Sequence, residues 1–267
     1  MRLGRIAAIV VRQYYLVRGS ASRILPMFVW VAIDIVLWGF ITKYLAALTG
    51  SGFHFVPALL GAVLLWDFLT RVMQGVTMAF FEDVWSRNFL NVFASPISVP
   101  EYLGGLVISS ICTSSLGLGI MLLVATLAFG LSFFSYGVML APFLLILFLT
   151  GIALGITGTA IVLRLGPAAE WFVWPIPAVL SPFVGVFYPL STLPYWMRAI
   201  SHILPPSYVF EGMRAIVAGR GVIPVTLALG FGLAIAAILL ACWFFFVVFR
   251  YAVRTGLIAR YSAETVS

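Results

Sequence analysis

The sequence predicts an all-α integral membrane protein with six transmembrane helices. Its 267 residues are 63% hydrophobic and only 9% charged, whereas about 25% of the residues of soluble domains are charged because water must solvate their surface. Its mean hydropathy is +1.16. The apolar residues form long runs at near-regular intervals without a long polar stretch between them. We therefore expect a single transmembrane domain over residues 1–267.

Six apolar segments are long enough to cross a bilayer. A hydrocarbon core of about 30 Å requires a helix of about 20 mostly apolar residues. The fifth segment contains several prolines, which a span tolerates where neighbouring helices or water satisfy the freed backbone groups. The expected spans cover residues 25–45, 55–80, 103–129, 137–163, 171–190 and 222–249.

The basic residues predict the orientation of these spans. An even number of spans places both termini on the same side of the membrane. If that side is the cytoplasm, the cytoplasmic stretches carry ten basic residues and the exterior stretches carry four. Cytoplasmic loops are normally the richer in Lys and Arg, so we expect both termini, including the tail over residues 250–267, to be cytoplasmic. Because basic residues at span ends indicate headgroup contact, the net charge of +7 does not point to nucleic acid.

The segment before the first span, residues 1–24, has an amphipathic pattern. Apolar residues recur near one helical face and arginines fall on another, namely Leu3, Ile6, Val10 and Val17 against Arg5 and Arg12. This pattern predicts a helix that lies along the cytoplasmic headgroups. A frayed basic tail is the alternative.

A second amphipathic segment covers residues 82–96, between the second and third spans. Its large apolar residues recur at i, i+4, i+7 and i+8 among charged ones, and Pro96 ends it. The spacing predicts a short cytoplasmic helix, whose apolar stripe rests on the bilayer or docks into a partner protein.

The exterior connection over residues 191–221 contains two short amphipathic helices. We expect them at residues 195–204 and 207–218, separated by Pro205 and Pro206, with Ser207 as N-cap and Gly219 as helix stop. Both are too short to cross a bilayer. They should form a hairpin that dips into the outer leaflet, with interfacial aromatics at Tyr188, Tyr195, Trp196 and Tyr208.

Catalytic and cofactor motifs are missing from the sequence. The one lysine, Lys43, is not in a Gly-Lys-Ser/Thr loop, so a phosphate-binding loop is excluded. His54 and His202 have no metal ligands at suitable spacing, and Cys112 and Cys242 lie within apolar runs. We therefore expect no catalytic residue, metal or bound cofactor. Energy for driven transport must come from another subunit or from an ion gradient.

Three ionisable residues, Asp34, Asp67 and Arg71, lie well inside the first two spans. A charge at mid-bilayer costs about 2.5–3.5 kcal/mol or more unless it is paired or hydrated. Asp67 and Arg71 are one helical turn apart, and Asp34 has a depth similar to that of Arg71. There are three interpretations of these charges: a structural ion pair, a gate or lining of the substrate path, and a proton relay. Opposite charges at matching depths favour the structural ion pair.

Small residues recur every four positions in the third and fourth spans. These residues are Ser109, Thr113 and Gly117, and Gly151, Gly155 and Thr159. Such patterns let helices approach closely. Packing is the expected role, and contact with a substrate is the alternative.

The end of the fifth span and the exterior hairpin carry a recognisable motif. The sequence reads Phe-Tyr-Pro-Leu-Ser-Thr-Leu-Pro-Tyr-Trp over residues 187–196, Leu-Pro-Pro-Ser-Tyr over 204–208 and Glu-Gly-Met-Arg over 211–214. It resembles the signature of type-2 ATP-binding-cassette (ABC) exporter permeases. Residues 81–96 also resemble the first cytoplasmic loop of that family, with acidic residues before an apolar helix and an Ala-Ser-Pro end.

This resemblance implies the membrane subunit of an ABC exporter in a bacterial cytoplasmic (inner) membrane. Two copies would form the translocation path, driven by two copies of a separate cytoplasmic ABC ATPase that holds ATP and Mg, so the chain itself is not an enzyme. The export of a drug, a lipid or a lipid-linked glycan is implied, without indicating which. Residues 82–96 would be the coupling helix that contacts the ATPase, through Glu82, Asp83, Trp85, Arg87 and Phe89. The exterior gate hairpin would use Tyr188, Pro189, Pro194, Trp196, Tyr208, Glu211 and Arg214.

Two other classes of function stay open. One is an ion-coupled transporter or channel that works alone with Asp34, Asp67 and Arg71. The other is an intramembrane transferase, for which Glu82 and Asp83 form the adjacent acidic pair. Copurification of a cytoplasmic ATPase would count against the first, and activity of the purified chain alone would favour the second.

Overall fold

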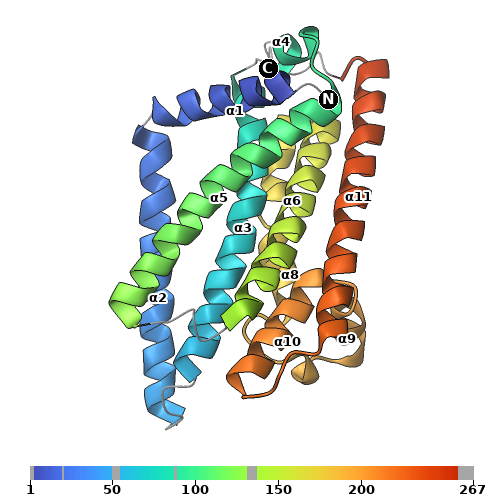
Figure 1. Ribbon diagram of the computed structural model, residues 1–267. Helices are drawn as coiled ribbons and strands as arrows, with labels where there is room; N and C mark the ends of the chain where they lie inside the picture. Colours follow the sequence, from blue (N-terminus) through green and yellow to red (C-terminus); the bar gives the residue numbers. More distant parts are fainter. Residues whose placement is uncertain (1–2, 20, 50–54, 87–88, 131–136, 258–267) are drawn as a thin grey trace.

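The computed structural model describes residues 3–19, 21–49, 55–86, 89–130 and 137–257. Within these ranges every regular element is a helix and there is no strand, which confirms the all-α prediction. Figure 1 shows an elongated bundle with α1 (Leu3–Arg18) and α4 (Phe89–Ala94) at one end, and α9 (Tyr195–Ser201) and α10 (Pro205–Val217) at the other. We refer to these as the α1 end and the α10 end.

Five long helices run between the two ends (Figure 1). They are α2 (Ala21–Thr49), α3 (Phe55–Trp85), α5 (Val99–Phe129), α6 (Leu140–Leu165) and α11 (Pro224–Arg254). Each coincides with a predicted span, although most extend beyond the predicted ends. In the described part of the chain, α3, α5, α6 and α11 are long and apolar enough to cross a membrane. The count of six spans stays a prediction.

Residues 171–190 do not form one spanning helix. A short 3-10 turn (Pro167–Ala169) leads into α7 (Glu170–Val173), and α8 (Ile176–Val184) follows after a break. Pro175 lacks a backbone N–H and lies in this break. Gly185, with φ of +70°, then ends α8 in the left-handed region that suits glycine. At about 1.5 Å per residue, α8 alone is far shorter than a hydrocarbon core of about 30 Å.

Two predicted helix bounds are wrong near the polar connections. The segment 82–96 is not one helix, because α3 continues to Trp85 and α4 is a separate helix. In the hairpin, α10 begins at Pro205 rather than Ser207, and Leu204 is its N-cap. Prolines fit the first turn of a helix, where the missing N–H would have no intrahelical partner. The helix stop is confirmed, since Gly219 has φ of +70° just after α10.

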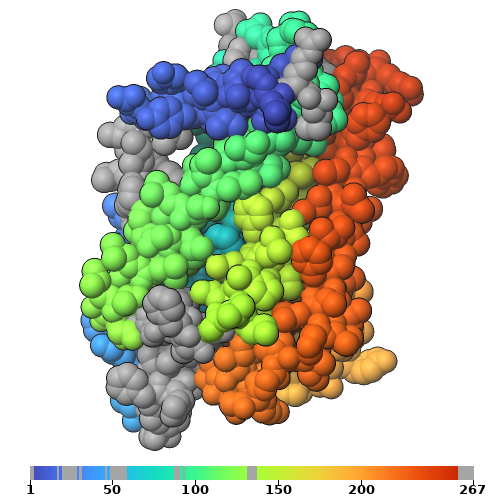
Figure 2. All heavy atoms as spheres, in the orientation of Figure 1, coloured from blue at the N-terminus to red at the C-terminus, as the bar shows by residue number. Residues whose placement is uncertain are grey.

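Small residues let α6 lie against α3, as predicted. A Cβ added to Gly151 would lie 2.7 Å from Val72 Cβ, and one added to Gly155 would lie 2.7 Å from Val76 Cβ. Contacts this close leave no room for a side chain. The other face of α6 packs against α11, so α6 lies between two long helices. In Figure 2, the middle of α3 is visible in the gap between α5 and α6.

The surface of the bundle carries large apolar side chains. On α2, Leu37 and Phe40 are exposed, and on α11 Leu239, Leu240 and Trp243 are exposed. A soluble monomer rarely leaves so much contiguous apolar surface in water. This surface suits a hydrocarbon environment.

We expect the substitution Gly155→Ala to lower the stability of the bundle by about 1–3 kcal/mol, because overpacking forces α6 and α3 apart. Thermal unfolding of the detergent-purified chain measures this. Gly119→Ala on α5 is the matched control, since nothing lies within 4 Å of a Cβ there; it should be neutral or stabilise by up to about 1 kcal/mol through helix propensity. Equal melting temperatures for the two variants would contradict the packing role.

Candidate functional site

At the α1 end, α1 lies across the bundle and packs on α5 (Figure 1). Ile6 and Ile9 are buried, and a Cβ added to Gly105 of α5 would lie 2.6 Å from Ile9 Cγ2. Leu3, in contrast, is 83% exposed. The predicted helix is therefore present, but Ile9 rather than Leu3 belongs to its buried face.

The polar residues of α1 attach it to α3 and α5. Arg12 forms an ion pair with Asp83 of α3, and Tyr102 of α5 donates its hydroxyl to Asp83 Oδ2 at 2.8 Å. Only 1% of Asp83 is exposed. A carboxylate this buried must be paired and hydrogen-bonded. We call Arg12, Asp83 and Tyr102 the Asp83 clamp.

A second ion pair lies nearer the start of α1. Arg5 Nη1 is 3.3 Å from Glu101 Oε2, and Glu101 is 3% exposed. The same Glu101 oxygen accepts the Ser98 N–H at 3.0 Å, which caps the start of α5. Gln13 adds a hydrogen bond from its Nε2 to the Ala79 carbonyl of α3 at 3.1 Å.

Arg5 and Arg12, on the predicted polar face of this helix, are therefore paired within the protein, and the position of the helix along the headgroups stays a prediction. Both point to buried carboxylates, whose desolvation requires a charged partner. Burial lowers the pKa of Arg12 from its ordinary value, and Tyr102 and Glu82 oppose that shift. An arginine stays protonated at physiological pH even so. The guanidinium of Arg12 therefore keeps its positive charge across the physiological pH range.

The residues predicted to couple to an ATPase differ in accessibility. Asp83 is part of the clamp and does not face outward. Trp85 is 49% exposed and donates its indole N–H to Glu170 Oε2 of α7 at 3.1 Å. Glu82 is partly buried. Arg87 lies outside the described residues, as does the side chain of Phe89. Trp85 is thus the predicted coupling residue with the most accessible described side chain.

In the middle of α3, the predicted ion pair is present. Arg71 Nε is 2.7 Å from Asp67 Oδ2, and the two side chains are 15% and 20% exposed. The charge of Arg71 also acts on Asp34 of α2. A Cβ added to Gly117 of α5 would lie 3.5 Å from Arg71 Cδ, so the glycine leaves space beside the arginine stem. The three predicted charges therefore form one cluster.

At the α10 end, Glu211 joins the two halves of the sequence motif. Its Oε1 accepts the Leu190 N–H at 2.9 Å and the Arg214 Nη2 at 2.9 Å. A Cβ added to Gly185 would lie 3.0 Å from Arg214 Nη2, so the turn after α8 rests on this arginine. Glu211 thereby connects the turn region after α8 to α10.

The other predicted hairpin residues support the same turns. Tyr188 donates its hydroxyl to the Pro182 carbonyl at 2.8 Å, and Tyr208 donates to the His202 carbonyl at 2.7 Å. Pro189 and Pro194 have extended backbone and precede helical turns. The ring of Trp196 meets that of Phe183 edge to face, with centroids 6.2 Å apart. The motif therefore builds a continuous set of short turns.

Sequence reasoning missed several residues of these sites. Arg198 donates to the carbonyls of Ser191 and Leu193, at 2.8 and 3.0 Å. Tyr102 and Glu101, at the start of α5, were also overlooked. An acid three residues after Ser98 was an available signal, because Ser-x-x-Glu before an apolar run is typical of a helix start. Nothing in the sequence pairs Tyr102 with Asp83.

An all-helical bundle with four described helices long and apolar enough to cross a membrane, and with paired charges in its middle, has the architecture of a helical membrane protein. The ABC-2 type transporter family matches residues 20–218. The chain therefore belongs to the ABC-2 type transporter family.

The chain is similar to inner membrane transport permeases over most of its length. It is 27% identical over 200 residues to the inner membrane transport permease YadH of Escherichia coli, covering 72% of this chain and 75% of that protein. The YadH protein of Shigella flexneri matches with the same identity and coverage. Together with the family match, these relatives confirm the resemblance to type-2 ABC permeases, and the chain is a transmembrane transport permease.

We expect Arg12→Gln to destabilise the protein by about 3–5 kcal/mol, because it leaves Asp83 as a buried charge without its cation. Thermal unfolding in detergent is the measurement. The exposed Arg18, near the end of the same helix, gives the control Arg18→Gln, which should change stability by less than about 0.5 kcal/mol. Combining Arg12→Gln with Asp83→Asn should recover part of the loss; no recovery would argue against the clamp.

Proposed function

We propose that this chain is the membrane subunit of an ABC exporter, with two copies enclosing the translocation path and a separate ATPase bound at the α1 end. ATP and Mg would be held by that ATPase, since this sequence has no Gly-Lys-Ser/Thr loop. The observation that carries the proposal is the Asp83 clamp in a member of this permease family. The clamp joins α1 to α3 and α5 close to Trp85, where we expect the ATPase to bind.

The α1 end would face the cytoplasm of a cell with the protein in its inner membrane. The ten basic residues of the stretches assigned to that side, against four on the other, support this orientation. The chain would cross the membrane six times, with α7 and α8 completing one broken crossing. Prolines and turns are tolerated there because neighbouring helices can satisfy the backbone.

Helix α3 would transmit movement between the two ends. Asp83, near its end, is held by Arg12 and Tyr102, and Trp85 follows two residues later. Toward the other end, the Trp66 ring lies 6.2 Å from the Phe210 ring of α10. From Trp66 to Asp83 the helix rises about 26 Å. A force applied beside Trp85 would therefore reach α10, which carries Glu211 and Arg214.

Coupling would follow from differences in binding energy between states. ATP binding would close the ATPase dimer and pull on α4 and the end of α3, and both copies would rock between inward and outward access. A conformational equilibrium shifts only by as much as a ligand's affinities for the two states differ. The two ion pairs of α1 would keep α1, α3 and α5 together during that movement.

An ion-coupled transporter is the second candidate, favoured by the cluster of Asp34, Asp67 and Arg71. One carboxylate pairs with the guanidinium of Arg71 and the charge of Arg71 acts on a second, so the cluster could bind a proton or cation. In the exporter, the same cluster would hold α2 and α3 in register.

We expect the purified, tagged chain to bring down a soluble ATPase from its native host, and Trp85→Ala to weaken that complex. Loss of an exposed tryptophan from an interface costs about 2 kcal/mol or more, roughly 30-fold in affinity. Trp243→Ala, at an exposed position on α11, is the control. Trp85→Phe keeps an aromatic ring but removes the hydrogen bond to Glu170, so it separates the contributions of the ring and of the hydrogen bond. Transport by the chain alone in proteoliposomes, driven by an ion gradient, would overturn the proposal in favour of the second candidate.

The charge cluster can be tested with a double substitution. Asp67→Leu alone should destabilise the protein by about 3–5 kcal/mol, because Arg71 loses its nearest partner. The pair Asp67→Leu and Arg71→Leu should restore stability, since apolar residues can replace a buried ion pair. Melting temperature and ATP-driven transport are measured together. Restored stability with restored transport indicates a structural pair, and restored stability without transport indicates a gating or relay role.

A further inference from the structure

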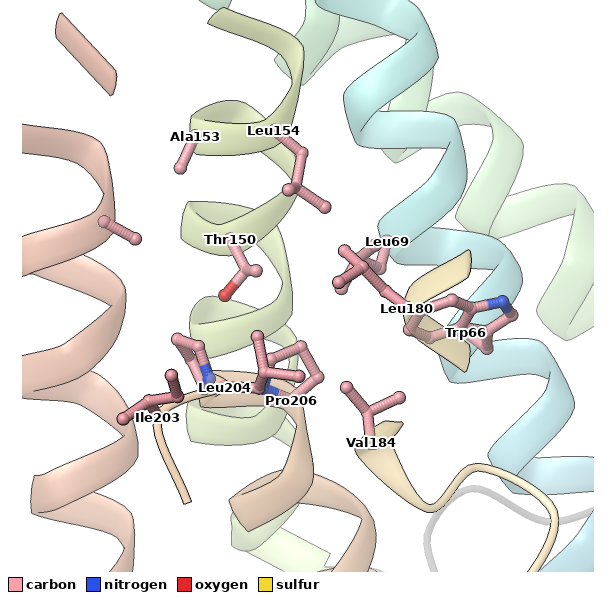
Figure 3. A pocket seen from close by; sticks show the side chains of 12 residues that line it. Trp66, Leu69, Thr150, Ala153, Leu154, Leu180, Val184, Ile203, Leu204 and Pro206 are labelled. Carbon is pink, nitrogen blue, oxygen red and sulfur yellow. The ribbon is translucent and has the colours of Figure 1, made fainter. Parts of the chain in front are cut away.

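An apolar cavity of about 120 Å³ lies inside the bundle, between α3, α6, α8, the beginning of α10 and α11 (Figure 3). Its buried wall includes Leu69 of α3, Ala153 of α6 and Val184 of α8. Leu204, Pro205 and Pro206 close it on the side of the hairpin. None of the sites described above uses this space.

The wall of the cavity offers almost no hydrogen-bonding group. Thr150 is a lining residue with a hydroxyl, and that hydroxyl already donates to the Ile146 carbonyl at 2.8 Å. Pro205 and Pro206 have no backbone N–H to offer. The indole nitrogen of Trp66 points away from the space in Figure 3. Water and polar ligands need several polar partners, whereas apolar cavities take up apolar molecules.

The cavity has a mouth on the surface of the bundle. Ile203, which lines it, is 67% exposed, and Leu180, Leu204 and Ala237 are partly buried beside it. Ala237 lies two residues from the midpoint of α11, residue 239 of Pro224–Arg254. If α11 crosses the bilayer symmetrically, Ala237 is within about 3 Å of the bilayer middle. The mouth therefore opens where the ends of lipid acyl chains lie, well away from the headgroups.

We propose that the terminal carbons of a phospholipid acyl chain occupy this cavity. An apolar cavity of about 150 Å³ in another protein takes up benzene, so a space of about 120 Å³ suits roughly five carbon atoms. The tail enters between α8 and α11 and ends against α3 and α6. The proposal rests on the shape, chemistry and depth of the cavity and does not depend on the transport function.

The position of the tail connects it to the hairpin. Leu204 to Pro206 form the start of α10, and the same helix carries Glu211 and Arg214, which hold the turn after α8. A tail in the cavity packs against this first turn of α10 and against α6 at once. The lipid thus supports the hairpin from inside the bundle.

Photolabelling of the full-length protein in lipid nanodiscs tests the proposal. The nanodiscs contain phosphatidylethanolamine, phosphatidylglycerol and a trace of phospholipid with a diazirine at the end of one acyl chain. After illumination, mass spectrometry should find label on the inner wall, in peptides containing Leu69 or residues 150–154. A second phospholipid, with the diazirine near its headgroup, should leave these peptides unlabelled.

A pair of adjacent alanines provides a matched control. Ala237 lines the cavity, and Ala236 is exposed on the surface of α11. Ala237→Phe should abolish labelling of the inner wall, and Ala236→Phe should leave it unchanged. If Ala237→Phe does not fold, Ala237→Leu and Ala236→Leu make the same comparison with a smaller side chain. Label confined to Ile203 and other surface positions, or inner-wall label that persists in the Ala237 variants, overturns the proposal.

Discussion

The position of α1 and of the helix ends beneath it depends on two carboxylates withdrawn from water. Asp83 and Glu101 are almost fully buried at the α1 end of α3 and α5. A buried carboxylate is stable only with a charged partner and further hydrogen bonds. Arg12, Tyr102 and Arg5 supply them. The interfacial helix is therefore positioned by charge compensation as well as by its apolar face.

Charged side chains also interact farther along the bundle, where they link elements that are separate in the sequence. Arg71 is paired with Asp67 in the middle of α3 and also acts on Asp34 of α2. At the α10 end, Glu211 and Arg214 hold the turn after α8. The Asp67–Arg71 pair is mostly buried, so its loss is more costly than that of a surface pair. The buried carboxylates at the α1 end, the charges around Arg71, and Glu211 with Arg214 are thus the places where movement between helices would be controlled.

Packing between the polar groups is set by small residues. Gly151 and Gly155 bring α6 against α3, and Gly105 brings α5 against Ile9 of α1. Close approach of this kind is the usual way in which helices associate where no water drives them together. The result is a packed unit in which α1 contacts α5, α5 contacts α3 and α3 contacts α6. The cavity beside α8 and α10 is a space in the described bundle where packing is incomplete.

Composition and apolar run length determined the helical class, the five long helices and the pair Asp67 and Arg71. These features follow from local properties: the length of a run relative to the bilayer, and the turn of a helix that puts residues i and i+4 on one face. The sequence motif also located the hairpin and its last residue, since Gly219 is the kind of residue that stops a helix.

Only the tertiary structure decided the partners of the charges and the course of the fifth segment. Arg12 and Asp83 are 71 residues apart in sequence, and nothing local distinguishes an arginine that faces headgroups from one that meets a buried acid. Likewise, prolines near Trp174 could have kinked a spanning helix or broken it. Neighbouring helices decide between these outcomes, because they determine which backbone groups can find another partner.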